Sequence, residues 1–267
     1  MQAELSRIDS GDVLELRLRD TGDTDNARDE DTVLELRRDG DPGPVVQVTG
    51  RLVGAGRVRA DLAEVPLDDG TWDVLWIAGD GRPRPLATTD PGFSMADRVA
   101  YLKRPRRREL RALRDPHGRL RLRARTVAPY AEVAWVEVGT DTVRVSGMPA
   151  YGPIAATGPA RLVARQRERS GTLTAPAALA AGEFRTEIPL EPLTRFHDPG
   201  RPHNEWDLWL DLPGVGELRL AARADDIVGK KKKVVYPETV LEAGVRIRPY
   251  YTVDDDLSLL ATLAGQA

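Results

Sequence analysis

Apolar and charged residues alternate along much of this chain. The alternation is clearest at 13–19, 33–37, 119–125 and 143–145, where charged residues separate apolar ones. Because successive side chains of a strand point to opposite faces of a sheet, this period of two predicts strands with one face on a core and the other in water. Turn-forming Gly, Pro and Asp clusters interrupt the pattern every 8–12 residues or so, roughly as in antiparallel sandwiches and barrels. No amphipathic helix is expected, and the run 173–181, which contains a proline, is predicted to be extended.

Parts of this pattern occur twice in the chain, as an internal repeat. Gly-Thr-Trp-Asp-Val-Leu-Trp at 70–76 returns as Asn-Glu-Trp-Asp-Leu-Trp-Leu at 204–210, and the strand-like segment 118–127 returns at 244–253. The chain is long enough for each copy to bury a core of its own. The repeat therefore predicts two domains that superpose through the Trp-Asp pairs and through these two strands.

The boundary between the copies lies near Tyr130, with no Gly/Ser-rich or Pro-rich linker. We therefore expect an all-β fold of two tandem antiparallel immunoglobulin-like β-sandwich domains, residues 1–130 and 131–267. Aromatic residues make up only 5% of the chain, so its tryptophans are expected to matter for packing. They are Trp72, Trp76, Trp135, Trp206 and Trp209.

The strand predicted at 204–210 carries candidate binding residues. Period two places Trp206 toward the core and puts Asp207, Trp209 and Asp211 on the outward face. A large aromatic side chain between two carboxylates can stack on a sugar ring or contact a partner surface. The alternative is that Trp209 packs beneath a neighbouring loop or the other domain.

Positive charge is concentrated in one segment, although the net charge is only −3. Residues 103–125 contain eleven Lys and Arg residues against Glu109 and Asp115, and 230–233 is a shorter run of lysines. Guanidinium groups match phosphate geometry, so this segment is a candidate polyanion site. The residues chosen are Arg104, Arg106, Arg107 and Arg108.

These four arginines lie outside the apolar faces of the alternating strands, so replacing all of them should leave the fold intact. Nucleic acid is not the expected partner, because aromatic residues that could stack on bases do not occur in the segment after Tyr101. An anionic cell-wall polymer or an anionic lipid surface fits the charge. The alternative is a solvated strand face with no partner.

The sequence offers no convincing catalytic or metal-binding constellation. The acidic stretch 20–31 lacks the glycine and glutamate spacing of a calcium loop and is expected to be a loop. Cysteine is absent, which excludes disulfides and thiolate metal sites. If the protein were an enzyme, His197, Asp198, His203 and Asp207 would be the residues to converge in a pocket. We expect no catalytic residue, no metal and no cofactor.

The second half carries an ordered set of motifs. They are Glu205-Trp-Asp-Leu-Trp-Leu, Arg219-Leu-Ala-Ala-Arg, Asp225-Asp-Ile, Lys232-Lys-Val-Val-Tyr-Pro and Arg248-Pro-Tyr-Tyr-Thr-Val followed by Leu257-Ser-Leu. Together they resemble the C-terminal β-sandwich regions of actinobacterial cell-wall polymer transferases, the glycosyltransferases and glycerophosphotransferases of teichoic-acid type. In that group Asn-Asn more often stands where this chain has Asp255-Asp256. The resemblance implies an accessory region, because transfer chemistry in such enzymes belongs to a separate α/β domain that nothing here resembles.

We therefore expect a non-catalytic recognition or assembly module that serves cell-wall glycopolymer synthesis. Its partner would be an anionic cell-wall polymer or glycan, a glycosyl- or glycerophosphotransferase, or a second copy in a homo-oligomer. The alternative is a transferase that acts on cell-wall polymers through an unrecognised site. The sequence shows no signal-peptide pattern and no membrane span, so the expected location is the cytoplasm, at the inner membrane face through partners.

Overall fold

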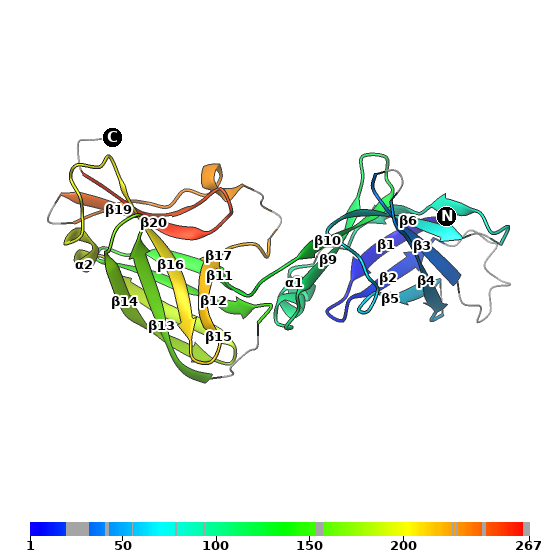
Figure 1. Cartoon of the computed structure of the whole chain (residues 1–267), viewed down its shortest axis with the longest axis horizontal. Coiled ribbons are helices and arrows are strands. Elements are labelled where there is room, and N and C mark those ends of the chain that lie inside the picture. Colours follow the sequence, from blue (N-terminus) through cyan, green and yellow to red (C-terminus); the bar gives the residue numbers. More distant parts are fainter. Residues whose placement is uncertain are drawn as a thin grey trace. The chain divides into compact units, whose positions relative to one another are not determined.

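The fold comes from a computed structural model, shown in Figure 1. The structure describes residues 1–19, 32–40, 43–54, 56–77, 79–92, 94–152, 157–225, 227, 229–241 and 244–263. The acidic stretch 20–31 lies outside these residues. The chain divides into two compact units: unit 1 is Met1–Tyr101 with Arg106–Val127, and unit 2 is Leu102–Pro105 with Ala128–Ala267. Both are built of strands, so the all-β class is confirmed.

Unit 1 is one continuous sheet. Its strands are β1 (Gln2–Ile8), β2 (Val13–Leu18), β3 (Thr32–Arg38), β4 (Val45–Leu52), β5 (Arg57–Asp61), β6 (Gly70–Ile77), β7 (Pro83–Pro85), β8 (Ala87–Asp90), β9 (Arg108–Arg114) and β10 (Leu120–Thr126). They run in the order β8-β1-β2-β5-β4-β3-β6-β10-β9, and β7 pairs with β6. The N–H of Leu120 donates to Leu86 O at 2.7 Å, and that of Thr88 donates to Gly118 O at 2.9 Å. These bonds join β8 to the start of β10, so the sheet closes on itself like a barrel.

Unit 2 is also one sheet that closes. Its strands are β11 (Tyr130–Val138), β12 (Thr142–Ala150), β13 (Thr157–Gln166), β14 (Thr172–Ala180), β15 (Glu183–Pro189), β16 (Asn204–Leu212), β17 (Gly216–Ala221), β18 (Thr239–Val240), β19 (Val245–Tyr251) and β20 (Leu257–Leu263). The order is β13-β14-β15-β12-β11-β17-β16-β20-β19-β18, and β13 also pairs with β16. The strands from β13 round to β16 therefore form a ring, from which β20, β19 and β18 continue. Each unit is therefore closed in the manner of a barrel or sandwich, and the finer expectation of tandem immunoglobulin-like domains stays a prediction.

The expectation of no helix was wrong. Helix α1 (Met95–Leu102) lies in unit 1 except for its last residue, Leu102, which belongs to unit 2, and α2 (Glu191–Thr194) and the 3-10 helix η2 (Lys230–Lys232) lie in unit 2. Helix α1 begins where the N–H of Arg98 donates to Ser94 O at 2.8 Å, and it buries Tyr101 and Leu102. It has only about two turns, too few for a helical hydrophobic period to stand out from the surrounding alternation.

The two units share a strand order: β1-β2-β5-β4-β3-β6-β10-β9 in unit 1 matches β11-β12-β15-β14-β13-β16-β20-β19 in unit 2. This shared order corrects the match between segments that was expected from the sequence. β6 corresponds to β16, and their neighbours β10 and β20 correspond to each other. The sequence instead matched 118–127, which contains β10, with 244–253, which contains β19. Gly118 and Gly244 both have positive φ, 80° and 72°, and both precede a strand, but they belong to turns of different hairpins. Because both arms of a hairpin alternate with period two, the pattern alone could not tell one arm from the other.

Each unit has a tryptophan at its centre. Trp72 and Trp206 are fully buried, opposite Leu122 on β10 and Leu259 on β20 respectively. Along β16 burial alternates as predicted, with Trp206 inside and Trp209 only half-buried. The alternation therefore assigns the faces of this strand correctly, and it places Asp207 and Asp211 on the outer face with Trp209.

Trp135 departs from the expectation that every tryptophan would matter for packing, because it is 66% exposed. β11 contains a bulge between Val133 and Trp135, where its pairing with β12 shifts by one residue. An extra residue in one strand reverses the face of every residue after it. Val133 is therefore buried, and Trp135, two positions later, points outward.

Candidate functional site

A cleft opens in unit 2 beside the outer face of β16. Its volume is about 490 Å³, and β16, β17, β19, β20 and the turns around them supply its walls. Asp207 stands among residues of both charges in this cleft. The lining residues are Arg167, His203, Glu205, Asp207, Arg219, Lys231, Arg248, Tyr250, Thr252, Val253, Asp254, Asp256 and Leu260.

Asp207 is held by three donors. Arg167 Nη2 lies 2.6 Å and Arg219 Nη2 lies 2.9 Å from its Oδ1, and Ser258 Oγ donates to the same atom at 2.9 Å. Burial alone would raise the pKa of Asp207, but the hydrogen bonds from Arg167 and Ser258 and the charge of Arg219 outweigh it and lower this pKa. Asp207 therefore stays ionised and acts as a hydrogen-bond acceptor. It is poorly suited to donate a proton.

Arg219 connects Asp207 with a second carboxylate. Its Nε lies 3.4 Å from Asp256 Oδ2, and Arg223 Nη2 lies 2.7 Å from Asp256 Oδ1. Arg219 Nη1 also donates to the backbone oxygen of Leu208 at 2.7 Å. Burial lowers the pKa of Arg219, against the raising effect of both aspartates. The wall of the cleft is thus a fixed row of alternating charges, most of which already have partners.

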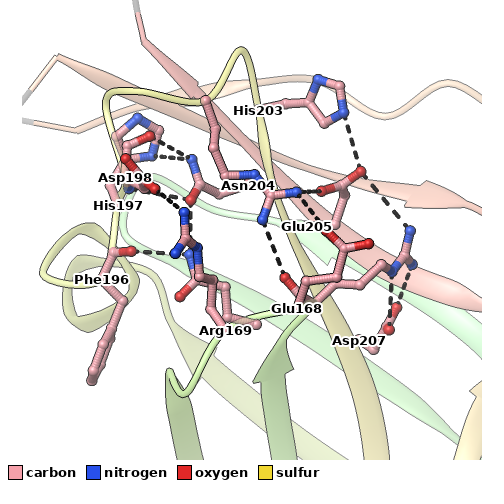
Figure 2. A network of polar contacts seen from close by, with 12 residues as sticks. Glu168, Arg169, Phe196, His197, Asp198, His203, Asn204, Glu205 and Asp207 are labelled. Carbon is pink, nitrogen blue, oxygen red and sulfur yellow. Dashed lines mark hydrogen bonds and ion pairs between the residues drawn. The ribbon is translucent and has the colours of Figure 1, made fainter.

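Figure 2 shows the other side of this network. His203 Nε2 lies 3.1 Å from Glu205 Oε1, and the second carboxylate oxygen of Glu205 is buried without a hydrogen bond among the described residues. Tyr250 lines the cleft, and burial raises the pKa of its hydroxyl. Glu205 on β16 and Tyr250 on β19 are half-buried, and the residues on either side of each are buried, so both side chains lie on the outer face of the sheet.

The histidines do not converge on one pocket. Figure 2 shows His197 and Asp198 on one side of Asn204, and His203, Glu205 and Asp207 on the other. His197 Nδ1 lies 3.3 Å from Asn204 Nδ2, in a network that includes the buried Asn204 side chain. Burial lowers the pKa of His197. Of the residues singled out for an enzymatic pocket, His203 and Asp207 line the cleft, whereas His197 and Asp198 do not.

Trp209 and Asp211 lie on the outer face, next to the cleft. The guanidinium carbons of Arg165 and Arg219 lie 5.0 and 4.9 Å from the centre of the Trp209 ring. Arg165 comes from β13 and Arg219 from β17, which pair with opposite edges of β16. Both cations lie over the ring, so they occupy surface on which a sugar would otherwise stack. Asp211 forms an ion pair with Arg161 at 2.7 Å.

The four basic residues chosen from the sequence divide into two pairs. Arg106 places its Nη1 2.7 Å from Asp12 Oδ1 and stacks 3.5 Å above Tyr101, and only 8% of its side chain is exposed. Arg108 donates to the backbone oxygens of Leu62 and Ala63 at 2.7 and 3.1 Å. Arg104 and Arg107 are exposed.

The expectation that all four arginines could be replaced without affecting the fold stays a prediction, but Arg106 and Arg108 make contacts that it did not foresee. The sequence pattern marks the faces of strands and says nothing about the loops that an arginine side chain holds in place. The shorter basic run is also partly structural: Lys230 is buried, with its Nζ 2.7 Å from Asp225 Oδ1.

Sequence reasoning missed most of the cleft. Arg167 follows β13, and Arg219 and Tyr250 belong to the ordered motifs of the second half, but nothing local showed that they face Asp207. Within the described residues, no group of three or more His, Asp or Glu is arranged to hold a metal ion. Nor is any helix of the described part of the chain long and apolar enough to cross a lipid bilayer.

No protein-family model matches the sequence, and no curated protein matches it. Among solved structures, residues 217–571 of S. aureus TarS are 16% identical, cover 62% of this chain and 50% of that one, and superpose with a TM-score of 0.38. A second S. aureus TarS structure is 14% identical over 62% of this chain and 32% of that one, with a TM-score of 0.37. The FN1–FN3 domains of chicken CNTN1 are 10% identical over 77% of this chain and 58% of that one, with a TM-score of 0.20.

This chain thus covers half or less of the two TarS structures. At these identities and TM-scores the likenesses establish neither a family nor a function.

Proposed function

We propose that this protein is a non-catalytic binding module for a cell-wall glycopolymer, and that the Asp207 cleft of unit 2 holds a polyol or sugar segment of that polymer. The observation that carries the proposal is the row of fixed donors and acceptors along the cleft. Asp207 and Asp256 accept, Arg167 and Arg219 donate, and each is held in place by the others.

Such a row suits hydroxyl-rich ligands. Each sugar or polyol hydroxyl can donate one hydrogen bond and accept others, so it can bridge a carboxylate and a neighbouring guanidinium. The opposite charges along the wall largely balance, which favours a neutral segment over a strongly charged one. Tyr250 and Leu260 add apolar surface against which carbon–hydrogen groups can pack.

The preference for binding over catalysis rests on the contacts of Asp207. Its carboxylate is engaged by Arg167, Arg219 and Ser258, which outweigh burial and lower its pKa, so it does not suit the role of a general acid. We therefore prefer a binding module to a transferase. The second half resembles teichoic-acid-type accessory regions, and this resemblance is the reason for proposing a teichoic-acid-type polymer as the ligand. For the same reason we propose that the protein works with a transferase in the cytoplasm.

The test is a binding titration of the full chain by calorimetry, with ribitol oligomers, N-acetylglucosamine oligomers and a purified teichoic-acid polymer. Asp207→Asn should weaken binding of the hydroxyl-rich ligand at least tenfold, since about 1.4 kcal/mol of a charged hydrogen bond corresponds to that factor. Asp211→Asn is the matched control, because it removes a carboxylate from the same face of β16 outside the cleft. If none of the ligands binds, or if both variants bind like the wild type, the proposal fails.

A further inference from the structure

A second groove crosses the outer face of unit 2, on strands that do not line the Asp207 cleft. Its volume is about 650 Å³, and its lining residues come from β11, β12, β15 and β14, which are neighbours in the sheet. Trp135 stands at its β11 end with 66% of its surface exposed. A tryptophan this open gives up much of the stability that burial would provide, which makes it a candidate ligand contact.

Strand register places the lining residues in two rows. In the first row, Trp135 lies opposite Ser146 and Ser146 opposite Arg185, across β11, β12 and β15. Neighbouring strands are about 4.8 Å apart, so Trp135 and Arg185 are separated by roughly 10 Å. That separation matches a sugar ring with a charged group attached to it or to the next unit. Pro176 and Ala178 of β14 supply apolar surface beyond Arg185.

The second row consists of Glu137, Arg144 and Glu187, which lie opposite one another on β11, β12 and β15, and its charges are paired. Arg144 lies 3.2 Å from Glu137 and 3.2 Å from Glu187, so its charge is compensated on both sides. Arg185 is exposed and forms no ion pair among the described residues, although Glu183 and Glu187 lie on the same face of β15, two residues to either side of it. The groove therefore presents one open aromatic face and one exposed cation that no ion pair holds in place.

We propose that this groove binds an anionic saccharide, with a sugar ring stacked on Trp135 and a phosphate group on Arg185. Stacking on an indole suits the apolar face of a sugar ring, and a guanidinium group pairs well with phosphate oxygens. Ser146 lies between the two and can hydrogen-bond a ring hydroxyl. A protein partner with an apolar surface fits less well, because Glu137, Arg144 and Glu187 border the groove. The proposal shares no residue with the Asp207 cleft and does not depend on it.

The experiment uses the full chain, with glucose 6-phosphate, glucose, inorganic phosphate and a purified teichoic-acid polymer as separate probes. Binding is followed through the indole N–H signal of Trp135 in two-dimensional NMR and by calorimetry. Glucose 6-phosphate should shift that signal and should bind at least fivefold more tightly than either glucose or phosphate alone. Its affinity should fall as salt rises.

Two variants separate the parts of the site. Trp135→Ala and Arg185→Gln should each weaken binding of glucose 6-phosphate and of the polymer about tenfold, and only Arg185→Gln should weaken phosphate. Both side chains are exposed, so the unfolding midpoint should hardly change. Arg104→Gln with Arg107→Gln is the matched control, since it removes exposed cations elsewhere.

Unchanged affinity in both groove variants would overturn the proposal. Loss of polymer binding in the Arg104/Arg107 control alone would also overturn it, and would return the polyanion site to the basic segment. If Trp135→Ala instead abolishes self-association seen by sedimentation, the groove is an interface between copies of this chain, and the saccharide site is rejected. The Trp135 indole N–H signal reports on the groove and not on the Asp207 cleft, whose lining does not include Trp135, so failure of one site is distinguishable from failure of the other.

Discussion

Unit 1 and unit 2 share a strand order and a central Trp-Asp pair, but they surround the aspartate differently. Asp73 on β6 faces Arg121 on β10, and the Arg121 Nε atom lies 2.7 Å from it. Asp207 on β16 faces the much smaller Ser258 on β20. The positive charge around Asp207 comes from side chains of other elements instead, and a cleft opens there. The cross-strand neighbour thus distinguishes the closed surface pair of unit 1 from the open cleft of unit 2.

The largest effect should come from the tryptophans that both units share. Trp72→Ala and Trp206→Ala should each lower the free energy of unfolding by about 3–5 kcal/mol, because each empties the middle of a core. Substitution by phenylalanine should distinguish the two tryptophans. Trp72 Nε1 donates to Asp68 O at 3.0 Å, whereas Trp206 Nε1 has no hydrogen-bond partner among the described residues. Trp72→Phe should therefore cost about 1 kcal/mol more than Trp206→Phe. Urea unfolding followed by circular dichroism measures both, and equal costs would contradict the comparison.

A buried glutamate in each unit gives the second test. Glu109 is 3% exposed and lies beside Arg98, Arg111 and Arg125. Burial alone would raise its pKa, but these arginines lower it to about 2. Glu132 is 5% exposed, and its carboxylate accepts hydrogen bonds from the Tyr130 hydroxyl and backbone N–H groups. Burial outweighs those bonds and raises its pKa.

The two groups should therefore respond to pH with opposite signs. The stability from Glu109 is present above its unfolded pKa near 4.5 and is lost as the pH falls toward 2, an effect on the order of 3 kcal/mol. The stability from protonated Glu132 is present below its unfolded pKa and is lost as the pH rises through the higher folded value. Carboxyl-carbon NMR titration gives both pKa values directly. Glu109 titrating near 4.5, or Glu132 titrating below it, would break the contrast.

The smallest effects separate the arginines of the basic segment. Arg106→Ala should lower the free energy of unfolding by about 2–3 kcal/mol, because it removes charged hydrogen bonds to Asp12 and Ser10 from a mostly buried position. Arg108→Ala should cost a similar amount through the carbonyls it holds. Arg104→Ala and Arg107→Ala are the controls and should change it by less than about 0.5 kcal/mol. Thermal or urea unfolding of the four single variants checks this, and a uniform response would show that the buried contacts contribute nothing.

The sequence alone was enough for features that depend on local periodicity. The all-β class, the strand at 172–180 and the two faces of β16 follow from alternation, because a strand turns every second side chain to the same side. The placement of Asp207 and Trp209 on the outer face followed in the same way.

The tertiary structure decided everything that depends on which strand lies beside which. The bulge that exposes Trp135 is visible only in the pairing of β11 with β12. The strands β10 and β19 have similar sequence patterns, and only their pairing with neighbouring strands shows that they are different arms of their hairpins. The closure of each sheet, the partners of Arg106 and Arg108, and the meeting of Arg167 and Arg219 at Asp207 are contacts between distant segments. The alternation of apolar and charged residues shows which face of its own strand a side chain occupies, but not which residue lies opposite it on the neighbouring strand. The cleft and the groove depend on those neighbours, so they could be found only in the folded chain.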